Sequence, residues 1–306
     1  MTTVAAIDCG TNSVRLLILR RDGETLRELA REVRLARLGQ GVDATGEFHP
    51  DALARTFVVV EEFARIIADH DVERLRFVAT SAARDVTNRQ LFVDGVRQRL
   101  GVEPSIISGD EEARLSSAGV LSGVDAPAPV LVFDIGGGST ELVVLDDDGA
   151  VTWAVSLDVG AVRVRERLLP SDPPQESELQ AARRFIGGMF DGSGVEFASI
   201  ATAVGVAGTV TSTAARALGL SAYSREAVHG SVLSRARIEA AVRHWNTTPV
   251  AEIEQEPCMH PLRAGVIGAG TLILDEISAR VPSGEVLVSE TDILDGIALE
   301  LLDQPS

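Results

Sequence analysis

The chain has 306 residues, of which 45% are hydrophobic, and this length suits either one large domain or two modest ones. A formal charge of −17 argues against nucleic-acid binding, which needs a basic surface, and no apolar run is long enough to predict a membrane span. With two cysteines and an N-terminus that lacks the signal-peptide pattern, we expect a cytoplasmic protein without a disulfide framework.

The first half of the chain begins with strands. They are expected at residues 3–8 and 14–20, around the polar turn CGTNS, and again at 25–37, where apolar and charged residues alternate. Residues 50–69 carry apolar side chains at helical spacing. The other elements expected in this half are a strand at 76–80, a helix at 87–100, a strand at 104–107 and a helix at 109–120.

The second half repeats this pattern after a segment rich in proline and glycine, residues 123–129. The expected elements are, in order, strands at 129–135, 140–146 and 150–157, helices at 160–169 and 175–190, a strand at 199–204, helices at 208–218, 234–245 and 263–280, a strand at 285–289 and a helix at 292–302. We therefore predict two α/β domains, residues 1–124 and 125–306, with the last helix (291–303) able to pack back on the first domain.

An internal repeat supports this division. The segment AAIDCGTNSVRLLIL at 5–19 aligns with LVFDIGGGSTELVVL at 131–145 at a constant offset of 126 residues. Asp8 falls on Asp134, and Ser13 falls on Ser139. Two domains of related topology that face each other across a cleft are the simplest interpretation.

Each repeated segment has an Asp-x-Gly turn suited to phosphate chemistry. Glycines let backbone N–H groups approach an anion, and the neighbouring hydroxyl and amide side chains add donors. Because Asp8 and Asp134 would repel a phosphate, a bridging Mg²⁺ is expected. All 28 basic residues are arginine, so a P-loop lysine is excluded and phosphate must be bound by arginine, metal, hydroxyls or backbone N–H groups.

Three further motifs have both a functional and a structural interpretation. In ISGDEEARLSSAGV (107–120), Glu111 and Glu112 lie in the first turn of the expected helix, where acidic residues also favour the helix dipole. In VATSAARD (78–85), Arg84 follows a buried strand and suits either a phosphate or a surface salt bridge. In AVGVAGTVTSTAA (203–215), the turn at Gly208 suits either a phosphate or nucleotide, or close backbone packing.

A cysteine-phosphatase loop is a competing interpretation of the first turn. The segment from Cys9 to Arg15 fits the spacing C-x5-R. That loop normally leads into a helix that lowers the thiol pKa, whereas residues 14–19 here predict a strand. We therefore expect Cys9 not to be the nucleophile.

Taken in order, AIDCGTNSVRLLI, VATSAARD, ISGDEEARLSSAGV, FDIGGGSTELVV and GVAGTVTSTAA resemble the exopolyphosphatase and guanosine pentaphosphate phosphohydrolase (Ppx/GppA) family, in its short two-domain form. The resemblance extends from the first strand to the last helix. It implies two ribonuclease-H-like domains of the actin-like ATPase superfamily with the active site between them. It also implies a homodimer, although residues 263–280 could be either interface or core.

The resemblance assigns roles to residues of this chain. Glu112 would be the catalytic base that deprotonates water, and Asp134 with Glu141 would hold Mg²⁺, or Mn²⁺ in its place, to which the first turn adds Asp8. The groups expected to bind phosphate are Asn12, Ser13, Arg84, Gly136, Gly137, Gly138, Ser139 and Gly208. The implied reaction is release of terminal orthophosphate from polyphosphate, in short chains because the C-terminal helical domains of longer members are missing.

Three other functions stay open at this point. The substrate could be guanosine pentaphosphate instead of polyphosphate. An ATP-dependent kinase of the same superfamily, acting on a small molecule, would share both turns and bind nucleotide at residues 205–209. A non-enzymatic nucleotide sensor would bind these compounds without releasing phosphate, and an intact Glu112 with both aspartates argues against it.

Overall fold

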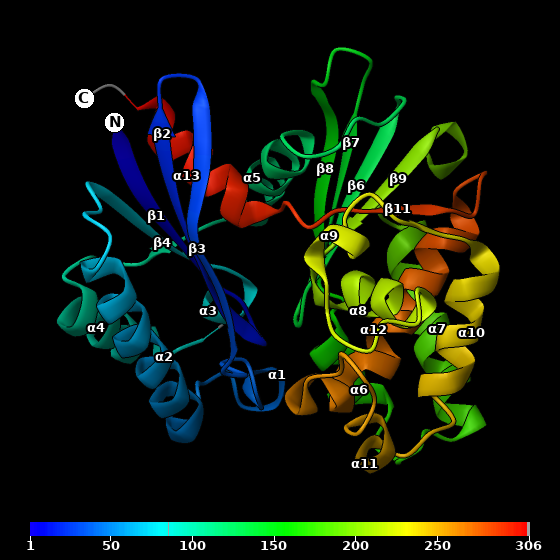
Figure 1. The fold of residues 1–306 in the computed structure, drawn as a ribbon. Coiled ribbons are helices and arrows are strands. Elements are labelled where there is room, and N and C mark those ends of the chain that lie inside the picture. Colours follow the sequence, from blue (N-terminus) through cyan, green and yellow to red (C-terminus); the bar gives the residue numbers. More distant parts are fainter. Residues whose placement is uncertain (85, 305–306) are drawn as a thin grey trace. The chain divides into compact units, whose positions relative to one another are not determined.

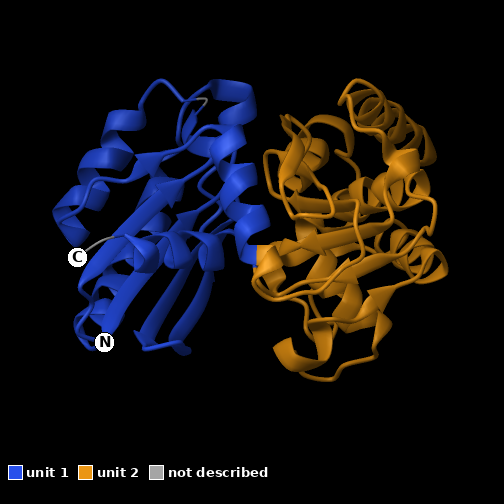
Figure 2. Ribbon diagram, turned by 90° about the horizontal axis from the view of Figure 1, so that it is seen from above, with its two compact units in different colours: residues 1–119, 292–306 blue, residues 120–291 orange. Residues whose placement is uncertain are grey.

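The structure is a computed structural model that describes residues 1–84 and 86–304. The chain folds into two compact units, which Figure 2 colours separately. Unit 1 comprises residues 1–119 and 292–306, and unit 2 comprises residues 120–291. The chain thus leaves unit 1 a few residues before the expected boundary at 124, and its last helix belongs to unit 1.

Unit 1 is built on a five-stranded sheet in the order β3-β2-β1-β4-β5. Figure 1 labels β1 to β4 of this sheet. Strands β1 to β3 are antiparallel neighbours, and β4 and β5 run parallel to β1. The strand bounds are β1 Thr2–Cys9, β2 Ser13–Asp22, β3 Thr25–Leu35, β4 Arg74–Ala79 and β5 Ser105–Ile106. The sheet is thus an antiparallel meander of three strands extended by two parallel strands.

Helices cover both faces of this sheet, because alternate residues of a strand point to opposite sides. Ile7 packs in one apolar cluster with side chains of α2 (Pro50–Ala68) and α4 (Arg89–Leu100). Val4 and Ala6 pack in another with α5 (Gly109–Leu121) and α13 (Ile293–Asp303). Burial on both faces explains why residues 4–7 of β1 are a continuous run of apolar residues.

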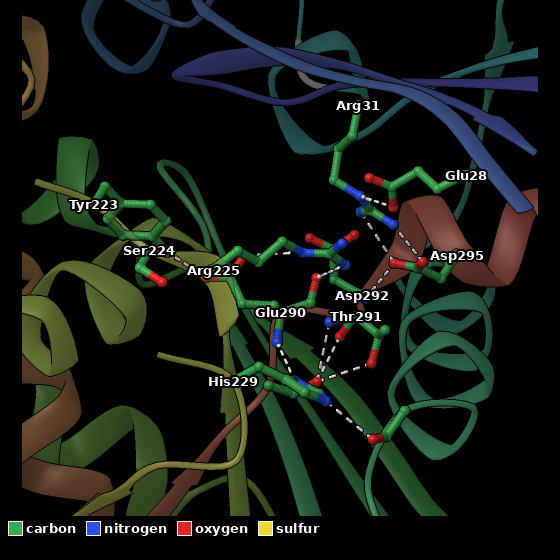
Figure 3. A network of polar contacts seen from close by, with 12 residues as sticks. Glu28, Arg31, Tyr223, Ser224, Arg225, His229, Glu290, Thr291, Asp292 and Asp295 are labelled. Carbon is green, nitrogen blue, oxygen red and sulfur yellow. Dashed lines mark hydrogen bonds and ion pairs between the residues drawn. The ribbon is translucent and has the colours of Figure 1, made fainter. Parts of the chain in front are cut away.

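The last helix, α13, is anchored at its first turn by charged side chains. Asp292 caps the helix by accepting a hydrogen bond from Leu294 N, and Asp295 Oδ2 accepts one from Asp292 N at 2.9 Å. Arg31 of β3 donates to the Asp295 carboxylate and to Glu28 (Figure 3). These contacts place the N-terminus of α13 against the sheet of unit 1.

Unit 2 is built on a six-stranded sheet in the order β10-β11-β9-β6-β7-β8. Its strands are β6 Val130–Ile135, β7 Thr140–Leu145, β8 Val151–Leu157, β9 Thr202–Val206, β10 Val232–Leu233 and β11 Val286–Val288. As β1 does in unit 1, β6 pairs antiparallel with the next strand and parallel with a later one. The main helices are α6 Ala161–Leu168, α7 Glu176–Asp191, α8 Ala207–Ala217, α10 Arg235–Trp245 and α12 Pro261–Arg280.

Most predicted elements are confirmed, with shifts of a few residues at their ends. The strand expected at 199–204 begins at Thr202, because Phe197–Ser199 forms a 3-10 turn. The sequence did not predict a group of four-residue helices and a two-residue strand: α1 Val42–Thr45, α3 Ser81–Arg84, α9 Arg225–Val228, α11 Val250–Ile253 and β10. Elements this short have no detectable periodicity. In the described chain, no helix combines the length and apolar character needed to cross a membrane.

Candidate functional site

The two repeated turns have the same backbone geometry. Gly10 N donates to Ser13 O at 2.9 Å, and Gly136 N donates to Ser139 O at 3.0 Å. Each turn closes an antiparallel hairpin, β1–β2 in unit 1 and β6–β7 in unit 2. The internal repeat is therefore a repeat of structure as well as of sequence.

The residue opposite the aspartate differs between the hairpins. In unit 1, Asp8 lies opposite Arg15, whose Nη2 contacts the Asp8 carboxylate at 2.7 Å and whose Nη1 contacts Asp292. Asp8 is buried, and burial raises its pKa although Arg15 acts in the opposite direction. To act as a metal ligand, the Asp8 carboxylate would have to give up its contact with Arg15 or bind the metal and Arg15 at the same time.

In unit 2, the equivalent pair consists of two acids. Asp134 lies directly opposite Glu141 across the β6–β7 ladder, and Glu141 is only 2% exposed. Ser156 Oγ, on β8, donates to Glu141 Oε1 at 2.8 Å. The described residues contain no group of three or more metal-ligating side chains, but two carboxylates completed by phosphate oxygens and water are a usual site for Mg²⁺. The pair therefore fits the predicted ion.

The glycine loop 136–139 is held through its carbonyl groups by the start of α6. Ala161 N donates to Gly136 O at 2.9 Å, Val162 N donates to Gly137 O at 2.8 Å, and the Arg163 Nε donates to Gly138 O at 2.8 Å. A side chain on Gly160 would lie 2.4 Å from Gly137 O, so only glycine allows this approach. With its carbonyls fixed on one side, the loop has a defined backbone geometry, as an anion-binding loop requires.

Glu112 and Arg84, predicted separately from two motifs, form an ion pair in unit 1. Arg84 Nη1 lies 2.9 Å from Glu112 Oε2 and also donates to Ile107 O at 3.3 Å. Arg84 ends the short helix α3 and does not follow directly from the strand as expected. Glu112 is buried in the first turn of α5, whereas its neighbour Glu111 pairs with Arg76 at 2.6 Å.

Ser108 caps α5. It precedes the first residue of the helix, and its hydroxyl accepts a hydrogen bond from Glu111 N at 3.2 Å. A serine in this position fixes the first turn of a helix. It therefore helps to fix the position of Glu112.

Asn12 and Ser13 lie in the unit 1 turn, and their backbone groups are structural. Asn12 O accepts hydrogen bonds from Ala36 N at 3.1 Å and from Arg37 N at 2.9 Å, and Ser13 pairs with Leu35 in the β2–β3 ladder. Arg37, which no sequence motif indicated, has a positive φ of 51°. An arginine gives no sequence signal for that conformation, because glycine is its usual marker.

Gly208 lies at the start of α8, as predicted. A side chain there would meet Arg263 Nη2 at 2.6 Å, so the glycine leaves room for this guanidinium. Arg263 also donates to Ser212 Oγ, in the same helix, at 2.9 Å. The sequence did not connect Arg263 with this turn, because the two are far apart in the chain.

Cys9 does not have the surroundings of a catalytic thiolate. It is 1% exposed at the end of β1, and burial raises its pKa well above the ordinary value. The segment that follows is the strand β2 instead of a helix, as predicted, and Arg15 pairs with Asp8 and Asp292. The cysteine-phosphatase interpretation therefore has no geometric support.

The two sheets and their paired turns define an α/β protein with two ribonuclease-H-like units, the predicted fold class. Residues 17–304 match the Ppx/GppA phosphatase family. The chain is 43% identical over 320 aligned positions to "Exopolyphosphatase 2" of Mycobacterium tuberculosis, covering 98% of this chain and 99% of that one. The chain belongs to the Ppx/GppA family. The predicted family and enzyme class, a phosphatase that hydrolyses phosphoric anhydrides, are confirmed.

Solved structures agree with this fold. A crystal structure of an exopolyphosphatase-like protein superposes with a TM-score of 0.94 at 40% identity, covering 98% of this chain and 97% of that one. The Aquifex aeolicus Ppx/GppA family member superposes with a TM-score of 0.83 at 29% identity, covering 100% and 99%. The fold class is thus confirmed over the full length of the chain.

Proposed function

We propose that the protein is an exopolyphosphatase that releases terminal orthophosphate from inorganic polyphosphate by direct attack of water. The ion pair between Arg84 and Glu112 is the observation that carries this proposal. It couples a group that binds phosphate to a group that accepts a proton, at a distance of 2.9 Å. The name of the M. tuberculosis relative supports polyphosphate as the substrate.

Arg84 can bind a phosphate without releasing Glu112, because a guanidinium has five N–H donors arranged in a fork. A terminal phosphate on Arg84 would then lie close to the Glu112 carboxylate. A water molecule between the phosphate and the Glu112 carboxylate would be oriented for attack on phosphorus. Its proton would pass to Glu112. The bond between the terminal phosphorus and the bridging oxygen would break, and that oxygen would leave with the shortened chain. Since the transition state for phosphoryl transfer is loose, orienting the water matters more than strong basicity.

Backbone N–H groups of Gly137, Gly138 and Ser139 are proposed to bind oxygens of the transferred phosphate, because Gly136 N already donates to Ser139 O. Mg²⁺ held by Asp134 and Glu141 would supply positive charge to those oxygens. Asp8 is better suited to holding Arg15, since the two already form an ion pair. The preference for short chains, the homodimer and the cytoplasmic location remain predictions.

The test is phosphate release from short polyphosphate, long polyphosphate and guanosine pentaphosphate, assayed side by side with Mg²⁺ for the wild-type protein and for Glu112→Gln. We expect polyphosphate to be preferred and Glu112→Gln to lose about 10²- to 10⁴-fold in kcat. Glu111→Gln is the matched control, since it removes a charge from the same helical turn but pairs with Arg76, and it should retain activity.

Near-wild-type turnover by folded Glu112→Gln would show that Glu112 is not the base. A preference for guanosine pentaphosphate would replace the proposed substrate but keep the proposed chemistry.

A further inference from the structure

Arg37 lies in a short loop, residues 36–39, that is hydrogen-bonded to the turn Gly10–Ser13 of unit 1. Gly39 N donates to Thr11 O at 2.9 Å, and Thr11 Oγ1 lies 3.0 Å from Ser81 Oγ. Ser81 begins α3, the helix that ends at Arg84. The loop, the turn and the helix that carries Arg84 are thus joined by hydrogen bonds within unit 1.

The backbone of Arg37 is held in an unfavourable conformation. Its φ of 51° lies in the left-handed region, which costs free energy for any residue with a side chain. The conformation is fixed by the hydrogen bond from Arg37 N to Asn12 O and by burial of the two neighbours, Ala36 and Leu38. Arg55 Nε adds a hydrogen bond to Ala36 O at 2.9 Å. The direction of the Arg37 side chain is therefore set by the fold.

The guanidinium of Arg37 is incompletely satisfied. Among residues 1–84 and 86–304, its Nε is buried and has no hydrogen-bond partner, and the same is true of Asn12 Oδ1 in the adjoining turn. The chain has 45 acidic residues against 28 basic ones, so carboxylates that could pair with the Arg37 guanidinium are abundant in the sequence. A buried donor without a partner costs free energy unless a ligand supplies an acceptor.

We propose that Arg37 is a further substrate-binding residue, whose guanidinium binds a phosphate group of the polyphosphate chain beside the Asn12 turn. The inference rests on the proposed function, since it assumes a phosphoric anhydride as the substrate. The Nε–H and one Nη–H of an arginine form the fork that matches two oxygens of a phosphate. The Asn12 amide can rotate to present its NH₂ group to the same anion.

The experiment compares wild-type protein with Arg37→Gly, Arg37→Lys and Arg27→Ala. Glycine suits the left-handed conformation, so Arg37→Gly removes the guanidinium without backbone strain and should fold at least as stably as the wild type. Arg27 is exposed on β3, and Arg27→Ala is the control for loss of one positive charge. Binding of tripolyphosphate is measured by calorimetry in EDTA, and KM and kcat are measured with Mg²⁺.

We expect Arg37→Gly to bind tripolyphosphate about 10- to 100-fold more weakly and to raise KM by a similar factor, with a smaller change in kcat. Arg37→Lys should fall between wild type and Arg37→Gly, because it keeps the charge but loses the fork. Arg27→Ala should resemble the wild type.

Equal affinity of Arg37→Gly and wild type for tripolyphosphate would overturn the assignment of Arg37, even if the wild-type enzyme hydrolyses polyphosphate. Weakened binding together with no hydrolysis by the wild type would support Arg37 but contradict the proposed function. No binding by the wild type in EDTA would contradict the assignment of Arg37, while the proposed function would still be tested by hydrolysis with Mg²⁺.

Discussion

At the scale of single residues, one exchange distinguishes the two hairpins. The position opposite the repeated aspartate is Arg15 in unit 1 and Glu141 in unit 2. The first pair joins opposite charges, whereas the second places two carboxylates opposite each other. The same backbone therefore provides a structural ion pair in one unit and a candidate cation site in the other.

The acidic pair Asp134 and Glu141 in unit 2 predicts that phosphate release depends on Mg²⁺. Chelation with EDTA should abolish phosphate release and added Mg²⁺ should restore it, and Glu141→Gln should raise the Mg²⁺ concentration needed for half-maximal activity. Cys9→Ala is the matched control for a thiol mechanism, and it should leave activity almost unchanged because burial keeps the thiol protonated. Phosphate release measured across a Mg²⁺ titration tests all three. Activity that survives EDTA but is lost in Cys9→Ala would refute the metal site.

The sequence predicts some of these residues better than others. Asp8, Asp134, Glu112 and Arg84 occur in motifs that can be recognised locally. The Asp8–Arg15 pair could also have been predicted, because the Gly10–Ser13 turn fixes which residues of the hairpin lie opposite each other. Arg37 could not, since its positive φ leaves no trace in the local residue pattern, and neither does the lack of a hydrogen-bond partner for its Nε among the described residues.

At the scale of elements, α5 and α13 approach each other through two glycines. A side chain on Gly119 would lie 1.8 Å from Asp292 O, and one on Gly296 would lie 1.9 Å from Leu115 O. The backbones of the two helices therefore touch. Since α5 carries Glu112, the position of this carboxylate depends on that contact.

We expect Gly296→Ala to destabilise the protein by about 1–3 kcal/mol or more, because the added methyl group would push α13 away from α5. Gly188→Ala is the control in an exposed part of α7, where a side chain would meet no other atom within 4 Å. It should be neutral or stabilise by about 0.5–1 kcal/mol, since alanine favours helix more than glycine does. Urea unfolding of both variants gives the two free energies. Equal stability of the two variants would mean that the helices tolerate separation.

Long helices such as α2 and α7 were predictable because their apolar residues recur at helical spacing over several turns. The four-residue helix α3 was not, although it carries Arg84. The contact between α5 and α13 could not be predicted either, because Gly119 and Gly296 lie in segments distant in sequence. Nothing in either segment alone distinguishes a glycine required for packing from one that is merely tolerated.

At the scale of the whole molecule, unit 2 is inserted into unit 1. The chain crosses from one unit to the other after residue 119 and returns after residue 291. Within unit 2, His229 joins the two ends of the insertion, since its ring contacts Gly123 O at 3.0 Å and accepts a hydrogen bond from Glu290 N at 3.1 Å (Figure 3). The first and last segments of unit 2 are therefore joined by hydrogen bonds within unit 2.

Removal of residues 292–306 should unfold unit 1 and leave unit 2 folded. The deletion takes away six buried side chains of the α13 cluster, namely Ile293, Leu294, Ile297, Ala298, Leu301 and Leu302. Their burial is worth on the order of 10 kcal/mol, comparable with the whole stability of a domain. Hydrogen exchange should show lost protection in residues 1–119 and retained protection in 120–291, compared with the intact protein. Retained protection in β1 and β2 would show that α13 is dispensable.

The insertion also sets an order of events during synthesis on the ribosome. Residues 1–119 emerge first, but α13, which covers part of one face of their sheet, is made only after the whole of unit 2. At about 5–20 residues per second, the intervening segment takes roughly ten seconds or longer to translate. During that interval Val4, Leu17 and Val78 have no α13 to cover them, whereas unit 2 is contiguous and can fold as it emerges. The nascent chain thus exposes the part of this apolar face that α13 covers until residues 293–303 have been translated, and this is the period in which a chaperone would protect it.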